Sequence, residues 1–390
     1  MIERACSAFL QRLASQFPVI CITGPRQAGK TTLARWAFPD HPYVSLENLD
    51  SAVRAQDDPR GFLASFPEGA VIDEIQRVPS LLSYLQQIVD ERPKPGAFIV
   101  TGSQQFGFMG ALAQSLAGRS GLLELLPFSV PELLPTLSGA LENSGTALWR
   151  GWYPSVFDRA LDPELWYGAY ISTYLERDVR QIENIRDMTA FRRFLALTAG
   201  RTGQLINLTE FAGECGVSHN TVKAWLSVLE ASYLVRLVQP YHRNFNKRIV
   251  KTPKLYFLDT GLAARLLGIR DASQLETHPA RGALFESFVY AELLKLRLNE
   301  HAPWDIYFWR DQQGHEVDFI LESGQSLTAI EVKSGATFHP DHVQSLTKFR
   351  NFAGDFIEAS LLIYGGSETF IFKDTRILPW NAGHGWGLSR

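Results

Sequence analysis

Cysteine is scarce in this chain of 390 residues, which contains only Cys6, Cys21 and Cys215. Three widely spaced cysteines form neither a disulfide framework nor the paired spacing of a zinc site. We therefore expect all three to pack as small apolar side chains. This usage of cysteine also fits a reducing compartment.

Long apolar runs are missing as well. No stretch reaches the roughly 18 consecutive apolar residues of a membrane-spanning helix, and Met1–Cys6 lacks the charged-then-apolar plan of a signal peptide. We expect a cytoplasmic protein without a membrane partner. With 45% hydrophobic and 20% charged residues, the composition is that of a globular protein. Its length predicts two to three domains, at about 100–200 residues each.

Strong net charge is also absent, since the formal charge is only −3. That small value hides an asymmetry. Between Ile171 and Arg270 there are 15 Lys and Arg against 8 Asp and Glu, which leaves −10 for the rest of the chain. A basic middle segment is compatible with a polyanionic partner, although a solvated basic face explains it equally well.

The segment Gly24–Thr31 fills every fixed position of the phosphate-binding pattern G-x-x-x-x-G-K-[ST]. An apolar strand pattern precedes it at Val19–Ile22, and a helical pattern follows it. Glycines permit a tight turn that brings backbone N–H groups and a helix N-terminus to the phosphates. Lys30 would reach the β- and γ-phosphates, and the Thr31 hydroxyl would bind Mg²⁺. The predicted nucleotide-binding residues are Gly24, Pro25, Arg26, Gln27, Ala28, Gly29, Lys30, Thr31, Thr32, Ser103 and Gln104.

An acidic pair, Asp73 and Glu74, follows a second apolar strand pattern at Ala70–Ile72. Apolar runs alternate with helical patterns here, which is typical of a parallel sheet covered by helices. Such sheets bind ligands at the carboxyl ends of their strands. We therefore expect Asp73 to hold Mg²⁺ through water and Glu74 to polarise the attacking water.

Two further strand patterns supply candidates for the same site. Ala97–Val100 ends in polar residues, and Ser103 or Gln104 would lie beside the γ-phosphate if this strand neighbours the first; a helix-capping serine is the alternative. Arg119 precedes an apolar run at Leu122–Leu126. It is a candidate to supply positive charge to the transition state in its own subunit or in a neighbouring one, and a surface salt bridge is the alternative.

Four segments together resemble an AAA+ ATPase: Gly24–Thr31, Ala70–Glu74 with the following Gln76–Pro79, Thr101–Gln105, and Leu116–Ser120 with Leu126–Ser129. Over nearly its whole length the chain is similar to prokaryotic ATP-binding proteins of the group labelled AAA_14 with DUF4143. This resemblance implies binding of ATP and slow ATP hydrolysis, with ATP and Mg²⁺ as cofactors. It implies no physiological substrate.

Two helical patterns joined by a glycine-containing turn, Leu205–Ala212 and His219–Leu226, predict a helix-turn-helix followed by the strands of a wing. The exposed side of the second helix would face a DNA groove, and the basic cluster after it would contact phosphates. The nucleic-acid-binding residues expected on this basis are His219, Asn220, Lys223, Arg243, Lys247 and Arg248. Such modules also dock proteins, so DNA contact and protein docking both stay open.

Carboxylates and a lysine recur at strand spacing near the C-terminus. Glu331 and Lys333 lie two residues apart on a predicted strand and point to one face, and Asp318 begins the strand expected to pair with it. With Glu286 on the preceding helix, this arrangement resembles the PD-(D/E)xK nuclease-like fold. The resemblance implies Glu286, Asp318 and Glu331 as Mg²⁺ ligands and Lys333 as the residue that orients water. A surface salt bridge, or a fold kept only for binding nucleic acid, is the alternative.

The predicted fold class is α/β: a parallel-sheet P-loop AAA+ domain, a helical winged-helix-like module, and a small mixed domain like that of restriction endonucleases. We predict an ATPase domain at 1–135, a helical connecting segment at 136–185, the winged-helix-like module at 186–270 and the nuclease-like domain at 271–390. The segment Pro127–Gly151, rich in Pro, Ser, Gly and Leu, marks the first boundary.

Two functions follow from these patterns. The first is Mg²⁺-dependent ATP hydrolysis by an AAA+ ATPase that controls a DNA-contacting winged helix and a nuclease-like domain, with Glu74, Arg119 and Lys333 as catalytic candidates. The second is a nucleotide-gated switch or scaffold that recruits protein partners, with the nuclease-like domain inactive. ATP is the expected ligand and DNA a candidate partner, and either function is compatible with an oligomer.

Overall fold

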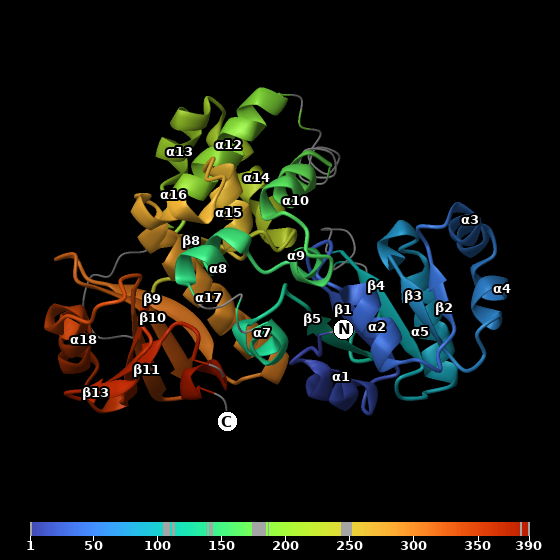
Figure 1. The fold of residues 1–390 in the computed structure, drawn as a ribbon. Helices are drawn as coiled ribbons and strands as arrows, with labels where there is room; N and C mark the ends of the chain where they lie inside the picture. The colour runs from blue at the N-terminus through green and yellow to red at the C-terminus, as the bar shows by residue number, and fades with distance from the viewer. Residues whose placement is uncertain are drawn as a thin grey trace. The chain divides into compact units, whose positions relative to one another are not determined.

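The fold is described from a computed structural model of the chain (Figure 1). The structure describes residues 2–103, 110, 114–137, 139, 143–173, 185, 187–242, 252–382 and 384–388. They form two compact units. The first comprises Met1–Phe128 with the short segments Ala231–Tyr233 and Leu298–His301, and the second comprises the rest of the chain.

The first unit is built on a five-stranded parallel sheet with the strand order β2-β3-β4-β1-β5. Strands β1, β3 and β4 are buried along their whole length, which is why their sequences are continuous apolar runs. The elements of this unit are α1 (Ser7–Ala14), β1 (Val19–Thr23), α2 (Lys30–Ala37), β2 (Tyr43–Ser45), α3 (Leu49–Asp57), α4 (Pro59–Ala64), β3 (Ala70–Asp73), the 3₁₀ turn η1 (Ile75–Arg77), α5 (Leu81–Glu91), β4 (Phe98–Gly102) and β5 (Ser120–Glu124).

Helices cover both faces of this sheet. Ile20 and Ile22 of β1 pack in one core with α1 and α2, while Val19 and Cys21 pack in a second core with α3, α4 and α5. Alternate residues of a strand point to opposite faces, so a single apolar strand serves both cores. The sheet is therefore the middle of three layers, with its strand ends free to carry polar residues.

The second unit begins with helices and a small antiparallel sheet of order β6-β8-β7. Helices α13 and α14 are joined by a short turn in which Gly216 takes φ 72°, the left-handed conformation that suits glycine at a helix end. The elements are α7 (Val130–Leu137), α8 (Ser144–Arg150), α9 (Pro154–Asp158), α10 (Pro163–Tyr170), α12 (Met188–Gly200), β6 (Gln204–Leu205), α13 (Leu208–Cys215), α14 (His219–Ala231), β7 (Val235–Val238), β8 (Lys254–Phe257), α15 (Thr260–Leu266) and α16 (Ala272–Thr277).

The same unit ends in a mixed six-stranded sheet of order β13-β14-β12-β11-β10-β9. Strand β10 is antiparallel to both of its neighbours, β9 and β11, whereas β11, β12 and β14 are parallel. The elements are α17 (Arg281–Glu300), β9 (Asp305–Arg310), β10 (Glu316–Ser323), β11 (Ser326–Lys333), η4 (Pro340–Val343), α18 (Gln344–Ala353), η5 (Gly354–Phe356), β12 (Ile357–Tyr364), β13 (Phe370–Phe372), β14 (Thr375–Pro379) and η6 (His384–Gly387).

A register shift in β10, between Val317 and Ile320, decides which side chains face α17. Val317 and Ile320 both belong to the core under α18, although they are three residues apart. Phe319 instead packs against Tyr290 of α17, with the ring centroids 5.9 Å apart. A β-bulge has this effect because one extra residue reverses the alternation. As a result Asp318 and Phe319 both face α17.

The two sheets of the second unit are joined along one backbone segment. Tyr241 donates its N–H to the Phe308 carbonyl at 2.7 Å, and Phe308 donates to the Gln239 carbonyl at 3.2 Å. The chain after β7 is thus paired with β9. The predicted boundary between residues 270 and 271 falls inside this compact unit.

The predicted fold class is confirmed: a parallel five-stranded sheet of the P-loop type, a helical region and a C-terminal mixed sheet follow one another along the chain. Within the described ranges, none of the helices combines the length and the apolar character needed to cross a membrane.

Candidate nucleotide-binding site and acidic cluster

The predicted phosphate loop connects the end of β1 to the start of α2. Gly24 takes φ 145°, and a Cβ atom there would lie 2.1 Å from the carbonyl oxygen of Leu125. Only glycine fits this approach. Gly29 takes φ 94° directly before the first residue of α2, so the loop enters the helix through a second left-handed position.

An arginine that the sequence did not single out fixes this loop. Arg4 is 6% exposed and donates from Nη1 to the carbonyl of Ala28 at 2.9 Å and from Nη2 to the carbonyl of Leu126 at 2.6 Å. A guanidinium with fixed donors holds two carbonyls in one geometry. Arg4 therefore positions the loop from the N-terminal segment.

Lys30 lies inside the loop. Its Nζ donates to the carbonyls of Gly24, at 3.1 Å, and Pro25, at 2.8 Å. Burial lowers the pKa of Lys30 to about 8, against the opposing effect of Glu74 and Asp73. An anionic phosphate beside this ammonium group would favour its charged form.

The carboxylate of Asp73, at the end of β3, accepts hydrogen bonds from three hydroxyl groups. Thr31 Oγ1 lies 2.9 Å from Asp73 Oδ1, the Tyr43 hydroxyl lies 2.9 Å from Oδ2, and Thr101 also donates to this carboxylate. The Thr31 hydroxyl and the Asp73 carboxylate are hard oxygen donors side by side, so the residues present fit Mg²⁺. Sequence reasoning missed Tyr43 and Thr101.

Glu74 is connected to Ser103 by a third side chain. Gln76 Nε2 donates to the Glu74 carboxylate and to Ser103 Oγ, the latter at 3.0 Å. Glu74 takes φ 58°, and its N–H donates to Thr101 Oγ1 at 3.3 Å. Burial raises the pKa of Glu74, and Lys30 opposes this shift. Glu74 and Ser103, both predicted for this site, therefore lie at the same edge of the sheet, and Gln76 bonds to both.

Arg119 does not reach this edge, which corrects one half of its predicted role. It precedes β5, whose Ser120 pairs with Val19 at the beginning of β1, whereas the phosphate loop follows the end of β1. Its guanidinium Nη2 instead donates to Asp90 of α5 at 2.9 Å. Arg119 cannot act on the nucleotide of its own chain from there, and its action on a neighbouring subunit stays a prediction.

The other predicted nucleotide-binding residues lie in the phosphate loop, on α2 or outside the described residues. Pro25, Arg26, Gln27 and Ala28 form the loop, and Thr32 is exposed on α2. Gln104 lies outside the described residues.

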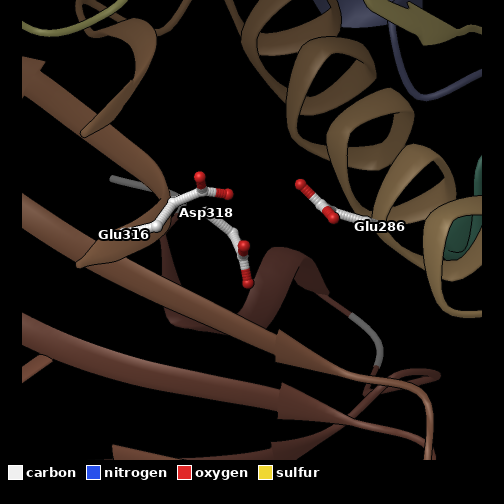
Figure 2. A group of neighbouring side chains, drawn as sticks. All are labelled: Glu286, Glu316 and Asp318. Atoms are coloured by element: carbon white, nitrogen blue, oxygen red, sulfur yellow. The ribbon is translucent and has the colours of Figure 1, made fainter. Parts of the chain in front are cut away.

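A second candidate site lies between α17 and the six-stranded sheet. One carboxylate oxygen from each of Glu286, Glu316 and Asp318 lies within 4.8 Å of the others. Figure 2 shows Glu286 extending from the helix toward the two acidic residues of β10. Burial raises the pKa of Asp318 well above its usual value, and Glu331 and Glu286 raise it further.

The third carboxylate of this group differs from the prediction. We expected Glu331 to join Glu286 and Asp318, but Glu331 bonds to Lys333 Nζ at 2.6 Å and accepts from Ser345 Oγ at 2.7 Å. Burial lowers the pKa of Lys333, but the surrounding carboxylates, Glu331 first and then Asp318, together outweigh burial and raise that pKa. The pair Glu331–Lys333 thus lies beside Asp318, while Glu316 completes the cluster.

A buried lysine from β8 points into the cluster. Lys254 is 2% exposed, and its Nζ lies 3.0 Å from Glu286 Oε1 and forms an ion pair with Glu316. Burial lowers the pKa of Lys254, but the surrounding carboxylates, Glu286 first, outweigh burial and raise it. With this ammonium group in place the cluster already holds a cation, so it does not fit an added Mg²⁺ as it stands.

The predicted nucleic-acid-binding residues fall into two groups. His219, Asn220 and Lys223 are exposed on α14, whose Val222 and Leu226 are buried. Arg243, Lys247 and Arg248 lie outside the described residues.

Comparison with known proteins gives the family. The AAA domain family matches residues 16–134, and two domains of unknown function, DUF8612 and DUF4143, match residues 142–273 and 281–382. Two uncharacterized proteins, Mb2031c of Mycobacterium bovis and Rv2008c of Mycobacterium tuberculosis, are each 35% identical over 382 residues, which is 96% of this chain and 83% of the relative. The chain belongs to the family of AAA-domain ATPases with a C-terminal DUF4143 domain. Membership in this family supports nucleotide binding and hydrolysis by the first unit of the ATPase.

Solved structures show more distant likeness. A Walker-type ATPase of Pyrococcus abyssi, PABY2304, is 15% identical with a TM-score of 0.42, over 68% of this chain and 96% of that one. A RuvB variant of Thermotoga maritima is 20% identical with a TM-score of 0.31, over 60% and 86% of the two chains.

Proposed function

We propose that the first unit of this ATPase binds ATP with Mg²⁺ and hydrolyses it, and that its nucleotide state controls a DNA-contacting winged helix and a nuclease-like domain in the second unit. One observation carries most of this proposal. The phosphate loop, the Thr31–Asp73 contact and the Glu74–Gln76–Ser103 chain all lie at the carboxyl edge of one parallel sheet, which is where such sheets bind ligands.

Each residue has a defined task in this mechanism. The loop N–H groups and Lys30 bind the phosphates, and Thr31 with Asp73 would hold Mg²⁺, which supplies neutralising charge to the phosphate oxygens when bound. Glu74 accepts a hydrogen bond from the attacking water and orients it, and Gln76 fixes the Glu74 carboxylate beside Ser103.

The order of elements in the second unit supports a winged helix. Helix α12 is followed by β6, then by the helix pair α13 and α14, and then by β7 and β8, which pair with each other and with β6. The exposed His219, Asn220 and Lys223 lie at the start of α14, the end that enters a groove in DNA-binding modules of this type.

A second candidate function is a nucleotide-gated switch that recruits protein partners, with the nuclease-like domain inactive. One observation favours it: Lys254 already fills the acidic cluster with a positive charge. DNA contact separates the two candidates.

The test is steady-state ATP hydrolysis by the purified chain with Mg²⁺, with and without duplex and single-stranded DNA. Glu74→Gln should keep nucleotide binding and lose turnover by about 10²–10⁴-fold, the usual contribution of a general base. Lys30→Ala should lose nucleotide binding itself. Glu68→Gln is the matched control, because Glu68 is exposed next to the amino end of β3 and pairs with Lys94.

The outcomes distinguish the two candidate functions and test the role of Glu74. DNA stimulation that disappears in Glu74→Gln would support the first function. Hydrolysis indifferent to both kinds of DNA would favour the protein-recruiting switch. Normal turnover in Glu74→Gln would refute the role given to Glu74.

A further inference from the structure

We propose that Lys254 is the internal counter-ion of the acidic cluster Glu286, Glu316 and Asp318, and that it keeps divalent metal ions out of this cluster. This role of Lys254 lies within the second unit and is independent of ATP hydrolysis by the first. A lysine of β8 takes the position that a metal ion would take among these three carboxylates.

The contacts place the ammonium group among the same oxygens that would bind a metal. Lys254 Nζ lies 3.0 Å from Glu286 Oε1 and pairs with Glu316, and these two residues and Asp318 place oxygens within 4.8 Å of one another (Figure 2). A lysine ammonium group is a compact point charge with three donors, so it satisfies several carboxylates at once. A divalent ion at this position would have to displace it.

The lysine is held in place by its surroundings. Strand β8 is the middle strand of its sheet, paired with both β6 and β7. Tyr256, two residues along and on the same face, donates to the same Glu286 Oε1 at 2.5 Å, and the Phe308 ring lies 5.6 Å from Lys254 Nζ. Lys254 is therefore a fixed part of the site and differs from a mobile surface lysine.

Other hydrogen-bond donors already occupy carboxylate oxygens that a metal ion would need as ligands. Arg310 Nη1 donates to Glu316 Oε2 at 3.1 Å, and the N–H of Val332 donates to Asp318 Oδ2 at 2.8 Å. Mg²⁺ requires oxygen ligands in a nearly ideal octahedral geometry. Removing Lys254 should free oxygens of Glu286 and Glu316 and leave the three carboxyl groups of the cluster without this ammonium group.

The experiment measures Mn²⁺ binding to the nucleotide-free full chain, by the loss of the free Mn²⁺ resonance signal, together with the thermal unfolding midpoint with and without Mg²⁺. The variant is Lys254→Met, which keeps an unbranched side chain of nearly the same length and removes its charge. It should bind Mn²⁺ at least about tenfold more tightly than the wild type, and Mg²⁺ should raise its unfolding midpoint. Lys254→Arg, which keeps the charge, should behave as the wild type.

Two controls locate the effect. Lys295 is 1% exposed and pairs with Glu292 at 2.8 Å, so Lys295→Met removes an equally buried lysine from the same unit. It should gain no Mn²⁺ affinity, and Mg²⁺ should not restore its stability. Adding Asp318→Asn to Lys254→Met should abolish the gain, because the cluster loses a carboxylate.

A further variant keeps the test decisive if Lys254→Met does not fold. Lys254→Gln removes the charge but keeps a side-chain amide that can donate to Glu286, so fewer buried carboxylate oxygens lose their partner. Glu286, Glu316 and Asp318 all remain, so this variant should also bind Mn²⁺ more tightly than the wild type. Equal affinity in the wild type and the variants, or a gain that survives Asp318→Asn, would overturn the proposal.

Discussion

Replacing Gln76 by alanine tests whether the amide between Glu74 and Ser103 supports turnover. The Gln76 amide donates to a carboxylate and, at 3.0 Å, to a hydroxyl. A hydrogen bond to a charged group contributes about 1.5–3 kcal/mol. If the transition state uses that full contribution, kcat falls roughly 10–100-fold at about 1.4 kcal/mol for each factor of ten. Nucleotide affinity should stay within about twofold, because Gln76 bonds neither the phosphate loop nor Thr31 in the described contacts.

The assay separates the two quantities. Nucleotide binding is followed with a fluorescent ATP analogue, and kcat is measured at saturating ATP. Gln87→Ala is the matched control, since Gln87 is an exposed glutamine that also donates to a glutamate, Glu91, at 3.1 Å. A kcat for Gln76→Ala equal to or above that of the wild type would refute the positioning role.

Two further substitutions test the geometry of the site. Gly24→Ala should abolish nucleotide binding, because its Cβ would lie 2.1 Å from the Leu125 carbonyl oxygen; Gly118→Ala, at φ 74° with nothing within 4 Å of the added atom, should keep it, and the same fluorescent analogue reports both. Thr101→Val preserves shape but deprives the Asp73 carboxylate of a buried donor, so urea denaturation should show a loss of about 1–3 kcal/mol in the free energy of unfolding, and an unchanged value would contradict the importance of this contact.

The arrangement of the candidate nucleotide site could largely be predicted from the sequence because its parts follow simple rules. The phosphate loop is continuous in the chain, and parallel strands end at the same sheet edge, which brings Asp73 and Ser103 to it. Arg4 could not be found this way. It contacts Ala28 from 24 residues away, and no local pattern marks that contact.

The same rules could have shown that Arg119 lies away from the phosphate loop of its own chain. A residue before a parallel strand lies at the opposite edge from a residue after one, and Arg119 precedes β5. The second helix of the helix-turn-helix is also longer than the predicted His219–Leu226, since α14 extends to Ala231 and β7 begins at Val235. Val222, Trp225 and Leu229 are buried at helical spacing, which favoured the helix.

The acidic cluster was only half predictable. Glu316 and Asp318 lie two residues apart on one strand, the same spacing that singled out Glu331 and Lys333, so Glu316 could have been included. Lys254 could not, because it lies 32 residues from Glu286 and 62 from Glu316 along the chain. Only the packing of β8 beside α17 and β10 reveals that these charges meet.

The pairing of Gln239 and Tyr241 with Phe308 bears on how this protein was assembled in evolution. A recombination event that exchanged only the part after residue 270 would import three carboxylates without their lysine and leave Lys254 buried and alone. Breaking a buried ion pair in this way costs roughly 3–5 kcal/mol, a large share of the stability of a domain. Exchange of the mixed sheet alone would therefore destabilise the chain unless the incoming segment, or a substitution of Lys254, restored the balance of charges.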